Sequence, residues 1–349
     1  MTKRLSVIAL AAVALLGCTK NNYIPVYKDQ LVFSAVASHS TKSIITTTNY
    51  PLDEPFVVEA VHYPDDNNPS EYSSFLSREK VQYSFEEALW FTKKTYFWPL
   101  SGDMVFYAGS PIIPELQMSP QHGVEADWSV PTDEHTQTDL CFAQFSSECA
   151  QHPAIVPIVF SHALSQVCFK ARTLKHYASS QTSGNLIQAD IFNVVLDSVK
   201  IHGIVSKGHF TQKPLGWTND TSVTADYTVY ANKEGLKLTC DRYDNPILNT
   251  LTTVLLIPQK ILRNATLEEW HHIEVRSSIT NTDTGNIEKD ITYQLPRHSV
   301  LRLSNYCKQW LMDFKYTFRI AVGMENEDTE ITTAVTDWME TKERIIGDE

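Results

Sequence analysis

Short runs of alternating apolar and polar residues recur along almost the whole chain, and they are rich in β-branched and aromatic side chains. Successive side chains of a strand point to opposite faces, so this alternation predicts strands with one buried face. Clusters of Gly, Pro, Asn and Asp, such as residues 64–69 and 283–286, separate the runs and predict turns. Many short strands joined by turns predict an all-β fold of the sandwich type. The predicted strands span residues 31–36, 56–61, 80–85, 104–108, 155–172, 191–205, 223–230, 250–257, 272–279, 287–295, 314–322 and 331–338.

The chain of 349 residues is longer than one hydrophobic core usually organises, so two domains are expected. Residues 179–184 form the longest stretch of small and polar residues between two sets of predicted strands. We therefore predict an N-terminal β-sandwich domain over residues 18–180 and a C-terminal β-sandwich domain over residues 181–349. Helical signals are few, and each is long enough for a turn or two only: residues 84–91, 265–270 and 305–314.

The N-terminus has the three-part order of a secretory signal. Basic Lys3 and Arg4 precede an apolar run over residues 5–16, and Gly17 stands directly before Cys18. The apolar run is too short for a bilayer span, which needs about 20 residues. We predict a lipoprotein signal peptide over residues 1–17 and acylation of Cys18, whose lipid would hold the polypeptide on a membrane surface. An ordinary signal peptide with an incidental cysteine is the alternative.

The chain is acidic. Its formal net charge is −12, and removal of Lys3 and Arg4 with the signal makes it −14. An acidic surface repels phosphate backbones, and no cluster of Lys and Arg interleaved with aromatic residues opposes that repulsion, so nucleic acid is not expected as a partner. The acidic runs at residues 65–66 and 325–330 lack the Gly-centred order of a calcium loop, and we interpret them as soluble turns.

Five cysteines follow Cys18, an odd number in which no pair has the C-x-x-C spacing. Export permits disulfides, but Cys141 and Cys168 lie within apolar, strand-like runs where a small buried thiol is the simpler interpretation. We favour free, buried thiols over a disulfide framework. The five are Cys141, Cys149, Cys168, Cys240 and Cys307.

The sequence contains no G-x-S-x-G, H-E-x-x-H, P-loop or G-x-G-x-x-G motif. Ser161 and His162 are adjacent, which would place their side chains on opposite faces of a strand and keep them from forming a catalytic pair. His272 and Glu274 share a strand face, a spacing seen in some metal sites, but the sequence identifies no further ligand. We therefore expect no enzymatic activity, no cofactor and no bound metal.

Seven short segments of aromatic and apolar residues stand in a fixed order behind the predicted signal. The segments are Tyr-Phe-Trp-Pro at residues 96–99, Val-Phe-Tyr-Ala-Gly-Ser-Pro at 105–111, Thr-Asp-Leu-Cys-Phe-Ala at 138–143, Phe-Ser-His-Ala-Leu-Ser-Gln-Val-Cys-Phe at 160–169, Leu-Leu-Ile-Pro-Gln at 255–259, Lys-Tyr-Thr-Phe-Arg-Ile at 315–320 and Ala-Val-Thr-Asp-Trp at 334–338. In this order, over nearly the whole mature chain, the sequence resembles the fimbrillin family of type V pilus lipoproteins. His162, within one of these segments, is then interpreted as a hydrogen-bonded structural histidine.

The resemblance implies two tandem transthyretin-like β-sandwich domains, exported as a lipid-anchored protein of the outer membrane or fimbrium of a Gram-negative bacterium. It implies other pilus subunits as partners, and a ligand on a host or bacterial surface is a further candidate. It also implies donor-strand exchange, in which a protease removes the first strand and a strand of the next subunit fills the groove. Here the strand that would leave contains Leu31, Phe33 and Ala35.

Two features depart from the family pattern. Stalk subunits of the family are cut after an arginine in the loop that follows the first strand, but residues 38–49 contain only Lys42 as a candidate processing site. The tail, residues 339–349, is short and charged, with Ile345 and Ile346 as its apolar residues. Both features favour a tip, accessory or anchor subunit over a polymerising stalk subunit.

A surface glycan-binding lipoprotein of a nutrient-uptake system is the alternative function. Trp128, Trp217 or Trp270 would then stack on sugars, although packing at sandwich corners also accounts for these rings. A third hypothesis, a glycosidase or protease, requires converging carboxylates or a Ser–His pair in a cleft.

Overall fold

The computed structural model describes residues 29–37, 50–64, 71–173, 177–179, 186–188, 192–238, 250–262, 271–281, 294–322, 330–337 and 344–346. Nearly all regular structure in these ranges is β, which confirms the predicted all-β class. The strands are β1 (Phe33–Ala37), β2 (Phe56–Tyr63), β3 (Ser73–Ser84), β4 (Leu89–Thr92), β5 (Asp103–Ser110), β6 (Leu116–Ser119), β7 (Gly123–Ser129), β8 (Cys141–Glu148), β9 (Val156–His162), β10 (Ser165–Thr173), β11 (Tyr177–Ser179), β12 (Leu186–Gln188), β13 (Phe192–Val205), β14 (Lys207–Gln212), β15 (Leu215–Asn219), β16 (Thr224–Lys237), β17 (Thr250–Leu256), β18 (His272–Asn281), β19 (Gln294–Arg302), β20 (Phe314–Val322), β21 (Glu330–Asp337) and β22 (Arg344–Ile346).

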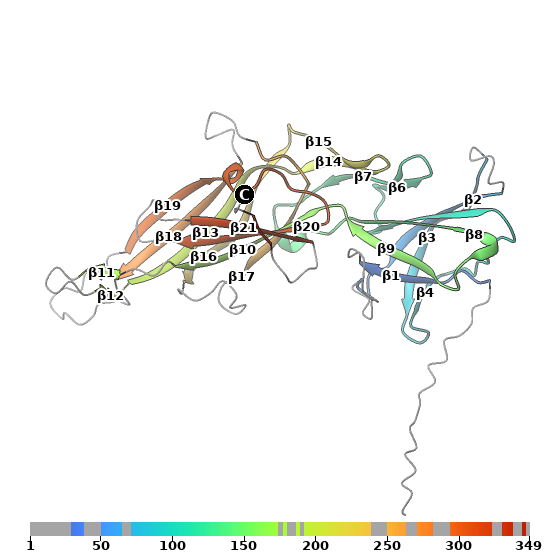
Figure 1. Cartoon of the computed structure of the whole chain (residues 1–349), viewed down its shortest axis with the longest axis horizontal. Helices are drawn as coiled ribbons and strands as arrows, with labels where there is room; N and C mark the ends of the chain where they lie inside the picture. The colour runs from blue at the N-terminus through green and yellow to red at the C-terminus, as the bar shows by residue number, and fades with distance from the viewer. Residues whose placement is uncertain are drawn as a thin grey trace, which may run out of the picture.

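Seven strands form one closed sheet in the order β1-β4-β3-β2-β5-β8-β9 (Figure 1). Apolar residues alternate along these strands, so one set of side chains points inward and fills a single core. That core includes Tyr50, Phe56, Trp90, Phe106 and Phe160, and Tyr50 stacks on Phe160 with ring centroids 4.8 Å apart. The enclosed aromatic rings explain why this part of the chain needs no helix to cover its sheet.

A second hydrophobic cluster lies among the remaining sheets and includes Val57, Tyr107 and Phe142 of the closed sheet. A five-stranded sheet of order β17-β10-β20-β21-β22 and a four-stranded sheet of order β16-β13-β18-β19 both contribute to it. A further sheet, β15-β14-β7-β6, lies between the two ends of the elongated molecule (Figure 1). Phe169 of β10 and Phe318 of β20 stack within this cluster with ring centroids 5.3 Å apart. Two separate cores therefore organise the described chain.

Strand pairing crosses the predicted domain boundary at residues 180 and 181. β10 precedes this boundary yet pairs with β17 and β20, and β7 pairs with β14. The second core also receives residues from β6 and β7, which precede β8 and β9 of the closed sheet in the chain. After β9, only Ala163 and Leu164 separate the closed sheet from β10. The division of the chain into two tandem domains stays a prediction.

One helical prediction was wrong. Residues 84–91 form a tight turn and the start of β4, because Ser84 of β3 pairs with Leu89 of β4 and Ala88 takes a positive φ of 55°. The predicted turns at 265–270 lie outside the described residues. Of the predicted helical residues 305–314, only Asn305 is in a helix, as the last residue of a short 3-10 helix, and Phe314 begins β20. The described 3-10 helices are Glu134–Thr136, Cys149–Gln151 and Leu303–Asn305, and no described helix is long and apolar enough to cross a membrane.

Gly102, at the turn before β5, is a position where a larger residue is expected to destabilise the closed sheet. Its φ is +85°, and an added Cβ would lie 2.2 Å from the Tyr63 carbonyl oxygen. Gly102→Ala should therefore lower the free energy of unfolding by at least about 2 kcal/mol. Thermal unfolding followed by circular dichroism measures this loss, with Ser101→Ala at the neighbouring exposed position as the control. An unchanged Tm for Gly102→Ala would contradict the backbone conformation described here.

Candidate functional site

Strand β1 lies where the closed sheet is completed. All five of its residues, from Phe33 to Ala37, pair in parallel with β9, from Val156 to Phe160. On its other edge, within the described residues, β1 pairs with β4 at one position only, Phe33 with Trp90. β1 is therefore held by a full ladder on one side and by a single residue pair on the other.

The segment that leads into β1 is fixed by the Tyr-Phe-Trp-Pro run at residues 96–99. Leu31 N donates to Tyr96 O at 2.8 Å, and Trp98 N donates to Asp29 O at 2.8 Å. The Trp98 ring in turn stacks on the His152 ring, with centroids 4.7 Å apart. This run therefore positions the start of β1 next to β9.

The side chains of β1 alternate between core and surface. Leu31, Phe33 and Ala35 are buried, and the Phe33 ring contacts the Phe106 ring edge-on at 6.2 Å between centroids. Ser34 and Val36 are partly exposed. Loss of this strand would open a groove in the core between β9 and β4. The structure thus brings together the three residues predicted for the exchanged strand, whereas Cys18 and Lys42 lie outside the described residues.

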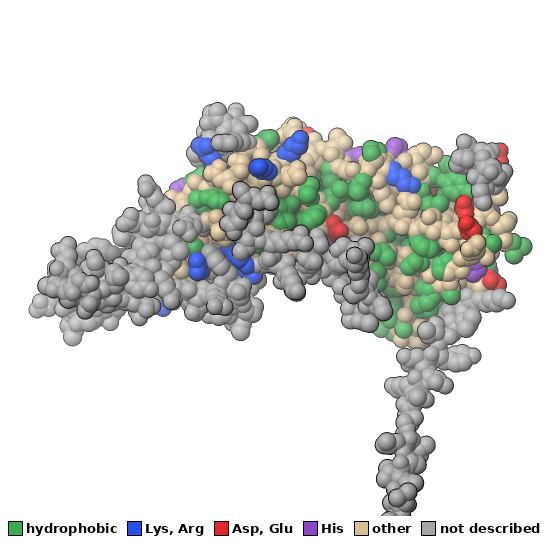
Figure 2. Space-filling model, in the orientation of Figure 1, with side chains coloured by type: hydrophobic (Ala, Val, Ile, Leu, Met, Phe, Trp, Pro, Cys, Tyr) green, Lys and Arg blue, Asp and Glu red, His purple; other side chains and the backbone are tan. Residues whose placement is uncertain are grey.

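Exposed apolar side chains surround this part of the closed sheet. Phe97 and Leu100 follow the Tyr-Phe-Trp-Pro run, and Val159 is on β9 beside Val36. Figure 2 shows hydrophobic side chains gathered over the closed sheet at this end of the molecule. An outer surface of this kind is compatible with contact to another polypeptide.

A second group of polar side chains meets at the end of β8 and β9. Cys141 pairs with His162 across these strands, and Asp139 lies just before β8. The His162 ring contacts an Asp139 carboxylate oxygen through Nδ1, and the Cys141 thiol donates to the same carboxylate oxygen at 3.2 Å. Burial, followed by the negative charge of Asp139, raises the pKa of the Cys141 thiol well above its ordinary value. A thiol held protonated in this way is a poor nucleophile.

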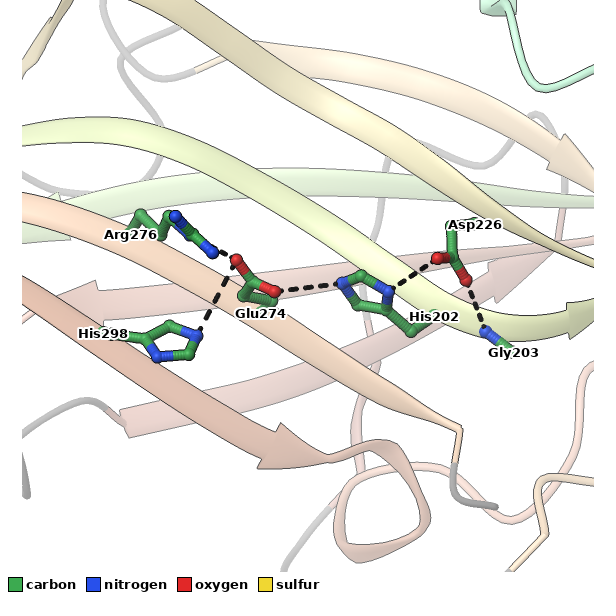
Figure 3. A network of polar contacts seen from close by, with 6 residues as sticks. All are labelled: His202, Gly203, Asp226, Glu274, Arg276 and His298. Atoms are coloured by element: carbon green, nitrogen blue, oxygen red, sulfur yellow. Dashed lines mark hydrogen bonds and ion pairs between the residues drawn. The ribbon is translucent and has the colours of Figure 1, made fainter. Parts of the chain in front are cut away.

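A third group lies on the sheet formed by β13, β16, β18 and β19 (Figure 3). His202 Nδ1 is 2.9 Å from Asp226 Oδ2, and its Nε2 is 3.3 Å from Glu274 Oε2. Glu274 also pairs with Arg276 and lies 3.7 Å from His298 Nε2. Burial acts to raise the pKa of Glu274, but the hydrogen bond and charge of Arg276 outweigh it and hold that pKa below its usual range. The group is a surface ion-pair network that links all four strands of this sheet.

The model of the fimbrillin-like family matches residues 56–338 of this chain. The chain belongs to the fimbrillin-like family. Its fold is similar to that of a fimbrial protein from Bacteroides vulgatus, with a TM-score of 0.62, 14% identity, and coverage of 88% of this chain and 99% of the other. It is also similar to a protein from Bacteroides uniformis assigned to cell adhesion, with a TM-score of 0.51, 13% identity, and coverage of 89% and 100%. No curated protein matches the chain.

The described tryptophans of this fimbrillin-like protein do not form the row of exposed rings that glycan stacking requires. Trp128 is only 8% exposed, although it contributes to the wall of a pocket of about 340 Å³. Trp217 is partly buried, donates from Nε1 to Ala163 O at 2.7 Å, and packs against Phe210. Trp270 lies outside the described residues. Packing accounts for the positions of both Trp128 and Trp217.

The predicted relation of Ser161 to His162 is confirmed, because His162 is buried while Ser161 faces the other side of β9 and is partly exposed. The His272 ring stacks on the His202 ring with centroids 4.6 Å apart, and Glu274 joins the ion-pair network. The preference for free, buried thiols is confirmed for the four described cysteines after Cys18, and Cys240 lies outside the described residues.

Two arrangements of buried polar side chains were not predicted from the sequence. Gln259, the last residue of Leu-Leu-Ile-Pro-Gln, is buried; its Oε1 accepts from Val205 N and its Nε2 donates to Val205 O and Ile257 O. This side chain completes the hydrogen bonding of a strand end, which is a structural role. The meeting of Asp139, Cys141 and His162 was also missed, although Cys141 and His162 lie in two of the segments that carry the family resemblance.

Proposed function

We propose that this fimbrillin-like protein is a structural or adhesive subunit of a type V pilus, assembled by donor-strand exchange in which β1 leaves. The observation that carries the proposal is the pairing of β1, which has a full ladder on β9 and one paired residue on β4. A strand held on one side can be withdrawn without cutting a sheet in two. Its buried Phe33 and Ala35 would leave positions that an incoming strand can refill.

The physics of exchange is β-augmentation. Ladder hydrogen bonds to β9 would supply affinity, and alternate side chains entering the core would fix the register of the incoming strand. The partners in this proposal are other pilus subunits, and a surface ligand on a host or bacterial cell is the target of an adhesive role. The buried Phe106, which contacts Phe33, is one wall of the groove that such a strand would enter.

Within the pilus, we assign the protein a tip, accessory or anchor role. Residues 38–49 offer Lys42 rather than an arginine for processing, and the tail over residues 339–349 supplies few apolar residues for donation to another subunit. Acylation of Cys18 would hold the protein on the outer membrane and present its folded part at the cell surface. Ser161 and His162 point apart, and burial raises the pKa of the Cys141 thiol, so neither group offers an activated nucleophile, and the role that we assign is structural.

Immunogold electron microscopy of the bacterium that carries the gene tests this assignment. Antibodies against the purified chain should label one end of surface filaments, and a strain that lacks the gene should show no label. Label along the whole filament would support a stalk role instead. Filaments without any label, together with absence of the chain from sheared filament preparations, would refute the proposal.

A further inference from the structure

The group of Asp139, Cys141 and His162 contains three kinds of metal-binding atom. Within the part of the chain that the structure describes, it is the one group of at least three His, Cys, Asp or Glu residues whose ligand atoms all lie within 4.8 Å of one another. Cys141 and His162 are buried, and the Asp139 side chain is 25% exposed. An ion could therefore enter past the carboxylate and reach two ligands held in the protein interior.

The distances fit a tetrahedral ion. Zinc binds sulfur at about 2.3 Å and nitrogen or oxygen at about 2.0–2.2 Å, which places a sulfur ligand roughly 3.5 Å from its neighbours. Cys141 Sγ lies 3.2 Å from Asp139 Oδ2 and 3.7 Å from His162 Nδ1. The Asp139 carboxylate and the His162 ring are in direct hydrogen-bond contact, so these two ligand atoms would have to move apart by about 1 Å to admit the ion.

The electrostatic surroundings also favour a cation. The carboxylates of Asp139, Asp313 and Glu54 all act on the Cys141 sulfur with negative charge. The second carboxylate oxygen of Asp139, Oδ1, is buried without a hydrogen-bond partner. Such a buried acceptor is costly unless a donor or an ion satisfies it.

We propose that Asp139, Cys141 and His162 bind one divalent transition-metal ion, with zinc as the ion that this ligand set suits best. On binding, the Cys141 S–H bond breaks, the sulfur bonds to the ion, and the proton passes to solvent. The proton that His162 Nδ1 donates to Asp139 passes to solvent, Nε2 takes up a proton in its place, and the neutral ring binds the ion through Nδ1. The thiolate and the carboxylate then balance the two positive charges of the ion, so no net charge is left in the interior.

The position of the site gives it a structural consequence. His162 ends β9, and its backbone N–H donates to Asp313 Oδ1, while Asp313 N donates to Leu164 O at 3.1 Å. The ion would therefore join β8 and β9 at the point where the chain passes to β10 and the second core. Metal binding is expected to stiffen this junction and raise the Tm of the protein.

Cobalt substitution tests the site directly. The purified mature chain with Cys18→Ala, which removes the N-terminal thiol, is titrated with Co²⁺ and then with Zn²⁺. We expect one ion per chain, a thiolate-to-cobalt charge-transfer band in the near ultraviolet, and displacement of that band by Zn²⁺. Cys141→Ser should remove the band and weaken zinc binding by at least about 100-fold.

Cys168→Ser is the matched control, because Cys168 is also a buried free cysteine in a strand. This substitution should leave the cobalt band and the zinc affinity unchanged. Circular dichroism establishes that each variant is folded, and His162→Gln provides a second variant if Cys141→Ser is not. Zinc should raise the Tm of the parent chain and not that of the variants. Absence of the band in the parent chain, or a band of equal strength in Cys141→Ser, would overturn the proposal.

Discussion

Replacing Phe33 with alanine is expected to lower the free energy of unfolding of the closed sheet by about 3 to 5 kcal/mol. Phe33 is fully buried, contacts Phe106, and occupies the single position at which β1 pairs with β4. Its loss leaves a cavity at the closure of the sheet, where few neighbouring atoms can move in to fill it. Urea unfolding followed by the fluorescence of the buried tryptophans, including Trp90, measures the change.

Ser34→Ala is the control on the same strand, because Ser34 is partly exposed and its replacement should change the free energy of unfolding by less than about 0.5 kcal/mol.

Phe33 also provides a test of strand exchange. A chain with an engineered protease site within residues 38–49 is cut, β1 is removed, and a peptide of residues 30–37 is added back. The peptide should bind, and its Phe33→Ala form should bind about 100-fold more weakly. Equal affinity of the two peptides would show that Phe33 does not anchor β1 in the groove.

The pattern of β1 explains why its buried face could be predicted from the sequence. Leu31, Phe33 and Ala35 are alternate apolar residues, so their common face follows from strand geometry alone. The same reasoning gave the all-β class. The alternation does not give the neighbours of a strand, because it is the same whether β1 pairs with β9, with β4 or with both. The one-sided pairing of β1 is therefore a result of the structure.

Arrangements that depend on strand order were missed for the same physical reason. Cys141 and His162 are far apart in sequence and become neighbours only because β8 and β9 pair at their ends. Residues 84–91 were misread because local residue type favours a helical turn there, whereas pairing of Ser84 with Leu89 imposes a tight turn. Strand pairing thus outweighed local helical preference at residues 84–91 and brought Asp139, Cys141 and His162 together at the other site.

Acid should destabilise the protein through His271, a residue that the sequence analysis did not single out as titratable. His271 is 4% exposed, and its Nδ1 accepts a hydrogen bond from Leu262 N at 3.3 Å. Burial, with a smaller effect of neighbouring His272, lowers the pKa of His271 from 6.5 to about 4. Between these two values the unfolded chain binds a proton that the folded chain excludes. Stability from this residue is therefore complete above pH 6.5 and falls by roughly 2 to 3 kcal/mol as the pH drops to 4.

His271→Asn isolates this contribution, because asparagine keeps a hydrogen-bond acceptor near Leu262 N and does not titrate. Urea unfolding of both proteins is measured at several pH values from 7 to 4. Their free energies of unfolding should converge as the pH falls, since protonation of residue 271 stabilises the unfolded state only in the parent chain. The exposed His135→Gln variant should follow the parent chain. A stability difference between the parent chain and His271→Asn that stays constant over this range would mean that His271 is protonated as readily in the folded chain as in the unfolded one. The buried environment assigned to His271 would then be incorrect.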